Sequence, residues 1–178
     1  MSTSSNKPPW TLEAKAKYSS FDGPRAAQYF GLEPLKPPPF FPIMSLLPMR
    51  CMLYIKAHFP AARYEDQFGE LWQCYWREAM DISKPDIMAK CLARHFSEDE
   101  VKAILAGGTS AEYKKMLTDE TARLVGKGAF GAPWFCVTRQ DGVEEPFFGS
   151  DRFPFMLRYL GVPFDDIKIR EKEGKARL

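Results

Sequence analysis

The chain has 178 residues, and its net charge of +2 is the balance of 25 basic and 23 acidic residues. A hydrophobic fraction of 45% is typical of a globular domain with a core, and no apolar run approaches the roughly 20 residues of a membrane span. The charges are spread along the chain, and the basic stretch KIREKEGK has acidic residues interleaved, so a nucleic-acid partner is disfavoured.

The N-terminal part of the chain predicts a loop, a short helix and a connector. The opening residues MSTSSNKPPW are polar and contain prolines, as loops do. Asp22 is a plausible N-cap and Gly31 a C-terminal stop, so a short helix is expected between them. The stretch LEPLKPPPFFP that follows is too rich in proline for a helix or a central strand, and it predicts an extended connector.

The middle of the chain predicts only helices for about a hundred residues. They are expected within residues 45–60, 64–80, 84–96, 97–105 and 110–128. Ser45 is a candidate cap of the first of these helices. Ser97 and Glu100 have the spacing of a capping box, and Gly107-Gly108 is predicted to end the helix that Ser97 begins.

An apolar stripe on the second of these helices predicts a face that packs against other helices, rather than an aromatic ligand site. Its members recur at helical spacing: Phe68, Leu71, Trp72, Tyr75 and Trp76.

The chain has four cysteines at wide spacing, with no C-x-x-C pair: Cys51, Cys74, Cys91 and Cys136. Three of them fall in stretches that are predicted to be buried helix or strand. This pattern favours small core residues in a reducing compartment over disulfides or metal ligands, and no metal site is predicted.

Strands are predicted only after Pro133. The stretch GKGAFGAPWFCV enters an aromatic and β-branched run through Pro133, a residue that belongs at a strand's first position or at an edge. WFCVT and EPFF are expected to form a hairpin around Gln140-Asp141-Gly142. A last helix is predicted to start at Ser150 and to stop at Gly161.

Three ordered motifs resemble the kappa-class glutathione transferases and their relatives, the 2-hydroxychromene-2-carboxylate isomerases and disulfide-bond oxidoreductases. They are NKPPWTLEAKAKY, GAFGAPWFCV and FFGSDRFPFMLRYLG, and the resemblance extends from Asn6 over nearly the whole chain. It implies an α/β fold, a thioredoxin-like (DsbA-like) fold with a large all-helical insertion. The family pattern also begins with a strand, a helix and a second strand, and we expect this N-terminal βαβ portion to be missing from this chain.

The resemblance implies a glutathione-binding site around the proline-led strand. Pro133 would be cis, and Ala132 would present its backbone N–H and C=O to the cysteinyl part of the ligand. Gly131 would be small because the ligand approaches closely. Ser150 would bind the γ-glutamyl carboxylate and Asp151 the ammonium, whereas the residues alone favour a helix cap at these two positions.

Asn6 and Lys15 match family positions near the remaining groups of glutathione, where a cation suits the glycyl carboxylate. A solvated lysine is the other interpretation of Lys15. The family's nucleophile-activating serine lies in the strand–helix–strand segment that we expect to be missing, so no catalytic residue is assigned. Ser2, Ser4 and Ser5 have no strand–helix pattern around them that would position them in its place.

The expected domains are a loop remnant of the thioredoxin-like domain over 1–20, a helical insertion over 21–126, the C-terminal half of the thioredoxin-like domain over 127–165, and a charged tail over 166–178. The expected function is transfer of the glutathione thiolate to a small electrophile, with peroxide or disulfide chemistry as a further possibility, in a homodimer. The alternatives are a glutathione-dependent chromene-carboxylate isomerase and a truncated, non-catalytic binding or interaction protein. A dithiol oxidoreductase is disfavoured because the chain lacks a C-x-x-C pair.

The last three residues, Ala176, Arg177 and Leu178, resemble the Ser-Lys-Leu signal that the peroxisomal import receptor binds. They follow a charged stretch, the usual context for such a signal. The sequence therefore predicts a peroxisomal location, with the mitochondrial matrix, where kappa-class relatives also occur, as the alternative.

Overall fold

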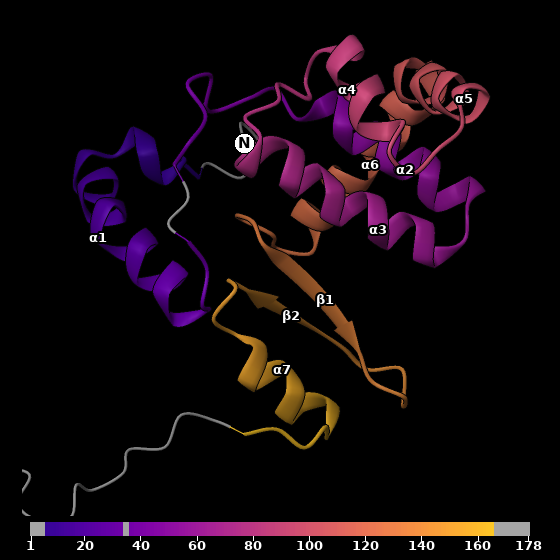
Figure 1. Cartoon of the computed structure of the whole chain (residues 1–178). Helices are drawn as coiled ribbons and strands as arrows, with labels where there is room; N and C mark the ends of the chain where they lie inside the picture. Colours follow the sequence, from indigo (N-terminus) through magenta and orange to yellow (C-terminus); the bar gives the residue numbers. More distant parts are fainter. Residues whose placement is uncertain (1–5, 34–35, 166–178) are drawn as a thin grey trace, which may run out of the picture. The chain divides into compact units, whose positions relative to one another are not determined.

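The computed structural model describes residues 6–33 and 36–165 (Figure 1). Within these ranges the chain divides into two compact units, one of residues 7–127 and one of residue 6 together with residues 128–165. We refer to the first as the helical unit and to the second as the sheet unit. No helix within the described ranges combines the length and the apolar character that crossing a bilayer requires.

The helical unit holds its core between five consecutive elements. Its elements are η1 Pro9–Thr11, α1 Glu13–Tyr29, α2 Leu46–His58, α3 Ala61–Trp72, the short π-helix η2 Gln73–Arg77, α4 Pro85–Leu92, α5 Glu98–Thr109 and α6 Ala111–Gly126. One cluster of buried side chains joins α2, α3, η2, α4 and α5, and among its fully buried members are Ile55, Met88, Leu92 and Ile104. Cys51, Cys74 and Cys91 are also fully buried there, as the sequence predicted for three of the four cysteines.

The sheet unit consists of a hairpin and one helix. Strands β1 Trp134–Thr138 and β2 Glu144–Phe148 pair antiparallel, with Trp134 opposite Phe148 and Thr138 opposite Glu144. Gly142 takes a φ of 82° in the connecting turn, which confirms the predicted Asp-Gly turn. The helix α7 Phe153–Leu160 lies along the hairpin (Figure 1). The ring centroids of Phe135 and Phe153 are 5.7 Å apart, as are those of Phe147 and Tyr159.

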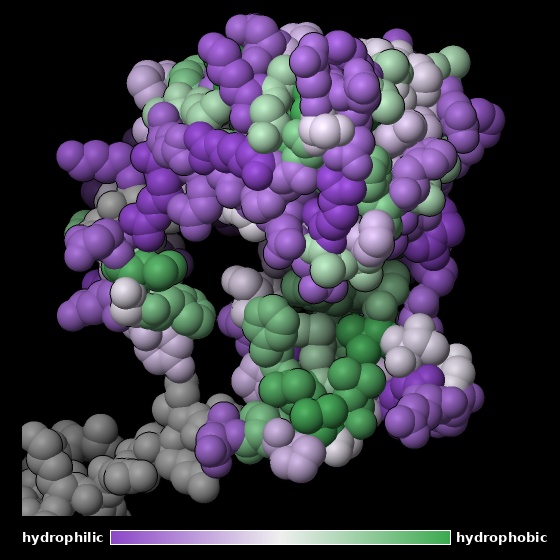
Figure 2. All heavy atoms as spheres, turned by 45° about the vertical axis from the view of Figure 1, so that its right-hand side comes forward, coloured by the Kyte–Doolittle hydropathy of each residue, from purple (hydrophilic) through white to green (hydrophobic). Residues whose placement is uncertain are grey.

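Much of the apolar surface of the sheet unit is exposed. Figure 2 shows hydrophobic side chains gathered over the part of the chain that carries α7. Four large apolar side chains in or next to this helix are between 42% and 54% exposed: Phe153, Phe155, Leu160 and Val162. Met156, by contrast, is the buried residue of α7.

Helix α1 is longer than predicted. It starts at Glu13, well before the predicted N-cap Asp22, and it includes Pro24. The residues ahead of Asp22 are mostly good helix formers, EAKAKYSS, and the Asp22 carboxylate accepts a bond of 3.2 Å from the Tyr18 hydroxyl one turn earlier instead of capping. The predicted stop is confirmed, because Gly31 follows the helix with a φ of 66°.

The predicted end of α5 at Gly107-Gly108 is wrong. The helix continues through both glycines to Thr109, and Ser110 then ends α5 and caps α6, where its hydroxyl accepts from the Tyr113 N–H at 3.3 Å. The glycines serve packing, since a Cβ on Gly107 would meet the Tyr54 ring, and one on Gly108 would lie 2.6 Å from Cys51 Sγ. The absent side chains therefore let α5 approach α2 closely.

This close approach predicts opposite effects of two glycine-to-alanine changes. Gly108→Ala is expected to lower the free energy of unfolding by about 1–3 kcal/mol, because the added Cβ overpacks the contact with Cys51. The matched control is Gly69→Ala on α3, where a Cβ meets nothing within 4 Å, and where alanine should add about 0.5–1 kcal/mol. Urea unfolding followed by circular dichroism measures both, and a Gly108→Ala protein as stable as Gly69→Ala would contradict the packing argument.

The aromatic stripe on α3 and η2 is only partly a packing face. Leu71 and Tyr75 are buried as predicted, but Phe68 is 48% and Trp72 54% exposed. The core-facing row of this segment is Gln67, Leu71, Cys74 and Tyr75. Tyr64, Phe68, Trp72 and Trp76 form a neighbouring row one turn apart, with successive ring centroids 6.2 to 6.5 Å from each other. Trp76 also packs against the core, so the predicted packing face is confirmed for Leu71, Tyr75 and Trp76 and is wrong for Phe68 and Trp72. The five positions span an arc of the helix that is wider than the face the core covers.

Candidate functional site

The entrance to β1 is tied to the start of the described chain. The Asn6 side-chain amide donates a hydrogen bond of 2.7 Å to the carbonyl oxygen of Phe130. A Cβ on Gly131 would lie 2.8 Å from the Phe148 ring and 3.0 Å from Asn6 Nδ2. Gly131 thus has two neighbours within the sheet unit that require it to be small, in addition to the predicted close approach of a ligand.

The predicted ligand-facing dipeptide follows directly. The Ala132–Pro133 peptide bond is cis, as the family resemblance predicted, and both residues are exposed. The Pro133 carbonyl oxygen accepts a bond of 3.1 Å from the Gly149 N–H, which continues the β1–β2 ladder by one step. This bond brings Ala132-Pro133 next to the turn that contains Ser150 and Asp151.

Ser150 and Asp151 do not lie in the last helix, contrary to the prediction that the helix starts at Ser150. Helix α7 begins at Phe153, with Arg152 as its N-cap residue and Pro154 in its first turn. Proline is favoured in the first turn of a helix, where its missing N–H leaves no intrahelical hydrogen bond unmade. The position of Pro154 therefore indicates a helix start after Ser150, and the sequence prediction missed this signal.

The Asp151 carboxylate is exposed and partly neutralised. Its Oδ2 pairs with Arg152 Nη1 at 2.5 Å, and the two side chains are 71% and 45% exposed. Gly149 reaches this turn with a φ of 102°, a conformation that favours glycine, and a Cβ there would lie 2.6 Å from Asp151 Oδ1. A ligand ammonium at Asp151 would have to compete with the Arg152 guanidinium.

Lys15 belongs to the other unit. It lies on α1 and is exposed, and its carbonyl oxygen accepts from the Ser19 hydroxyl at 2.8 Å. The sheet unit therefore brings together Asn6, Ala132-Pro133 and Ser150-Asp151, whereas the contact of Lys15 with the same ligand stays a prediction. Ser2, Ser4, Ser5 and the targeting residues Ala176, Arg177 and Leu178 lie outside the described residues, so the peroxisomal location also stays a prediction.

A pocket of about 560 Å³ on the described surface is formed by one helix face alone. It runs along α6 and is lined by Glu112, Lys115, Met116, Asp119, Glu120 and Arg123. None of the predicted glutathione-binding residues lines it. Since every lining residue belongs to one exposed helix, it is a surface depression, and we assign it no ligand.

One group of three candidate metal ligands occurs among the described residues, and sequence analysis did not predict it. A carboxylate oxygen of Glu70, the Cys74 sulfur and a carboxylate oxygen of Glu78 lie within 4.8 Å of one another. The Arg94 guanidinium bonds to Glu70 at 2.6 Å and to Glu78 at 2.6 Å. Because this cation already pairs with both carboxylates, the group is better described as an ion-pair network than as a metal centre.

Comparisons with known proteins agree with this architecture. A family model described as the DSBA-like thioredoxin domain matches residues 1–161. "Glutathione s-transferase kappa 2" of Caenorhabditis elegans is 30% identical over 173 residues, which cover 94% of this chain and 76% of the relative. "Glutathione S-transferase kappa 1" of the same organism is 29% identical, over 92% of this chain and 73% of the relative.

The DSBA-like thioredoxin domain defines the fold class. The mainly helical chain with its small two-stranded sheet confirms the prediction of a thioredoxin-like α/β fold with a helical insertion. Within that class the chain belongs to the kappa-class glutathione S-transferases. Its enzyme class is accordingly that of glutathione transferases and the related oxidoreductases.

Proposed function

We propose that the sheet unit binds glutathione and that the protein transfers the glutathione thiolate to a small electrophile. The observation that carries the proposal is the Gly149 N–H to Pro133 O bond of 3.1 Å, which holds the exposed Ala132-Pro133 dipeptide beside the Ser150-Asp151 turn. Two kinds of recognition group are then adjacent: a backbone segment for the cysteinyl residue, and polar side chains for the γ-glutamyl end.

The chemistry of glutathione suits this arrangement. Its γ-glutamyl end carries an ammonium and a carboxylate on one carbon, for which Asp151 and the Ser150 hydroxyl are complementary partners. The backbone N–H and C=O of Ala132 would pair with the cysteinyl residue as a short antiparallel strand would. Asn6 and Lys15 are the proposed partners of the remaining groups, with Lys15 suited to the glycyl carboxylate.

The proposed reaction requires the thiolate of bound glutathione. Hydrogen bonds donated to the sulfur lower the thiol pKa, and the thiolate then attacks the electrophile. The family resemblance assigns this donation to a serine that is not among the described residues. We propose a homodimer as the assembly, by the same resemblance.

Calorimetric titration with glutathione tests the role of Asp151. Asp151→Ala is expected to weaken binding about 5- to 30-fold, or about 1–2 kcal/mol, below the full value of a hydrogen bond to a charged group because the site is exposed and paired with Arg152. The matched control is Asp141→Ala. Asp141 is another exposed carboxylate of the sheet unit, and it pairs with Arg139 at 2.6 Å, so its loss should leave the affinity unchanged.

Two outcomes would contradict the proposal. Equal affinity of Asp151→Ala and the unchanged protein would exclude Asp151 as the ammonium partner. A folded, unchanged protein that gives no binding heat with glutathione would overturn the proposed function as a whole.

A further inference from the structure

Two of the four cysteines meet in the core of the helical unit. Cys74 lies on η2 and Cys91 on α4, 17 positions later in the chain, and their sulfur atoms are 2.8 Å apart. This separation is only about 0.8 Å longer than a covalent S–S bond of about 2.05 Å. Both residues have no exposed surface. The fold thus places the two thiols directly against each other.

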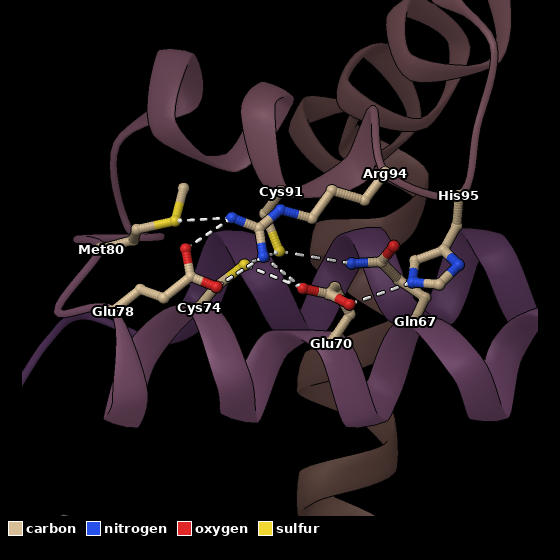
Figure 3. A network of polar contacts seen from close by, with 8 residues as sticks. All are labelled: Gln67, Glu70, Cys74, Glu78, Met80, Cys91, Arg94 and His95. Atoms are coloured by element: carbon tan, nitrogen blue, oxygen red, sulfur yellow. Dashed lines mark hydrogen bonds and ion pairs between the residues drawn. The ribbon is translucent and has the colours of Figure 1, made fainter.

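Polar groups surround the two sulfurs (Figure 3). Cys74 Sγ lies 3.6 Å from Glu70 Oε1, to which it can donate, and Cys91 Sγ accepts from the Gln67 side-chain amide at 3.6 Å. Gln67 is itself fully buried. The Cys74 sulfur therefore has a proton acceptor beside it, and the Cys91 sulfur has a hydrogen-bond donor beside it. Cys74 also lies on a single-turn π-helix, a feature that is frequent at functional sites.

The thiols lie one layer below the surface. Burial raises the pKa of Cys74 and of Cys91, so the resting pair is protonated at neutral pH. The groups above Cys74 are partly accessible, with the Glu70 side chain 18% and the Arg94 side chain 37% exposed. Hydrogen peroxide is small and neutral, so it needs a smaller opening to reach such a pair than a protein thiol does.

We propose that Cys74 and Cys91 form a reversible intramolecular disulfide when the protein meets a peroxide. Cys74 gives its proton to the Glu70 carboxylate, and the thiolate attacks one oxygen of hydrogen peroxide. An S–O bond forms, the O–O bond breaks, and the leaving hydroxide takes up the proton as water, which leaves a sulfenic acid on Cys74. Cys91 Sγ then attacks that sulfur, the S–S bond forms, and the S–O bond breaks as the leaving hydroxide takes up the Cys91 thiol proton and departs as a second water. One peroxide is thus reduced as the two thiols are oxidised.

This disulfide gives the helical unit a covalent link between η2 and α4. It is independent of the proposed glutathione site, because neither Cys74 nor Cys91 is among the residues proposed to bind glutathione, so each proposal can fail without the other. The link closes a loop of 17 positions and restricts the unfolded chain. The oxidised protein is therefore expected to melt about 5–10 °C higher than the reduced protein, and a thiol reductant should reverse the change.

Peptide mapping of the full chain tests the proposal directly. The reduced protein is treated with hydrogen peroxide, remaining thiols are alkylated under denaturing conditions, and trypsin releases residues 64–77 with Cys74 and residues 91–94 with Cys91. We expect these two peptides to appear joined, from protein that migrates as a single chain on a non-reducing gel. Cys51 and Cys136 serve as internal controls and should be recovered alkylated.

Variants separate the disulfide from general oxidation. Cys91→Ser is expected to abolish the rise in melting temperature, whereas the matched control Cys136→Ser should keep it. If Cys91→Ser does not fold, the peptide map of the unchanged protein decides alone. Recovery of Cys74 and Cys91 as separate alkylated or over-oxidised peptides, or a link that joins two chains or includes Cys51, would overturn the proposal.

Discussion

Replacing Ile104 with alanine is expected to lower the free energy of unfolding of the helical unit by about 3–4 kcal/mol. Ile104 lies on α5, has no exposed surface, and belongs to the buried cluster that joins α2, α3, η2, α4 and α5. Removing its outer carbons forfeits the hydrophobic transfer free energy and leaves a cavity. Gly108, one turn later, lies so close to Cys51 that α5 has no room to shift toward α2 and fill the space.

The matched control for this prediction is Leu46→Ala. Leu46 is the first residue of α2 and is 42% exposed, so its truncation should change the free energy of unfolding by no more than about 0.5 kcal/mol. Ile104→Val should be intermediate, at about 1 kcal/mol. Urea unfolding followed by far-ultraviolet circular dichroism gives the three midpoints at a common slope. Indistinguishable midpoints for Ile104→Ala and Leu46→Ala would show that Ile104 is not a core anchor.

The features that could be predicted from the sequence depend on near neighbours in the chain. The capping box needs only Ser97 and Glu100, and both of its bonds form, at 3.4 Å from the Glu100 N–H to the Ser97 hydroxyl and at 2.8 Å from the Ser97 N–H to the Glu100 carboxylate. The hairpin needs only the Asp-Gly turn between two apolar runs, and Gly142 adopts the expected positive φ. Interactions of this range are set by local residue types, whatever the rest of the fold does.

The features that were missed depend on tertiary contacts. Gly107-Gly108 has the sequence signature of a helix end, but the approach of α5 to α2 makes it a packing site inside the helix. Nothing in the spacing of Cys74 and Cys91 indicates that η2 and α4 bring their sulfurs together. The cis bond before Pro133 was predicted only through the family resemblance, because trans is the default for an X-Pro bond on local grounds.

The Arg63–Glu100 contact predicts a second large effect on stability. Arg63 Nη1 and Nη2 bond to the two carboxylate oxygens of Glu100 at 2.8 and 3.0 Å, and Nη2 also donates to the His95 carbonyl oxygen at 2.9 Å. Its guanidinium lies 4.7 Å from the Phe59 ring and 4.3 Å from the Phe96 ring. Arg63→Ala is expected to lower the free energy of unfolding by about 2–3 kcal/mol, because it removes a bidentate pair and two cation–π contacts together.

Arg63→Lys separates charge from geometry, since lysine keeps the charge but neither the planar fork nor its stacking on the rings. The free energy of unfolding of Arg63→Lys should be lower than that of the unchanged protein and higher than that of Arg63→Ala. Both Arg63 and Glu100 are 32% exposed, so added salt should screen their attraction in part. The differences in the free energy of unfolding between the unchanged protein and the two variants should therefore become smaller in salt but should not disappear. A lysine variant as stable as the unchanged protein would assign the whole effect to charge and would contradict the role of the fork.

The same contact predicts how the effect of Arg63→Ala changes with pH. The Arg63 side chain, followed by the Ser97 N–H, holds the pKa of Glu100 at about 2, well below its usual range. A carboxyl whose folded pKa is depressed contributes stability that is complete above its unfolded pKa of about 4.3 and is lost as the pH falls through the folded value. The stability gap between the unchanged protein and Arg63→Ala should therefore be constant from neutral pH down to about 5 and should narrow between about 4 and 2. Urea midpoints of both proteins across this pH range measure the stability gap. A gap that is as wide at about pH 2 as at neutral pH would show that Arg63 does not hold Glu100 ionised.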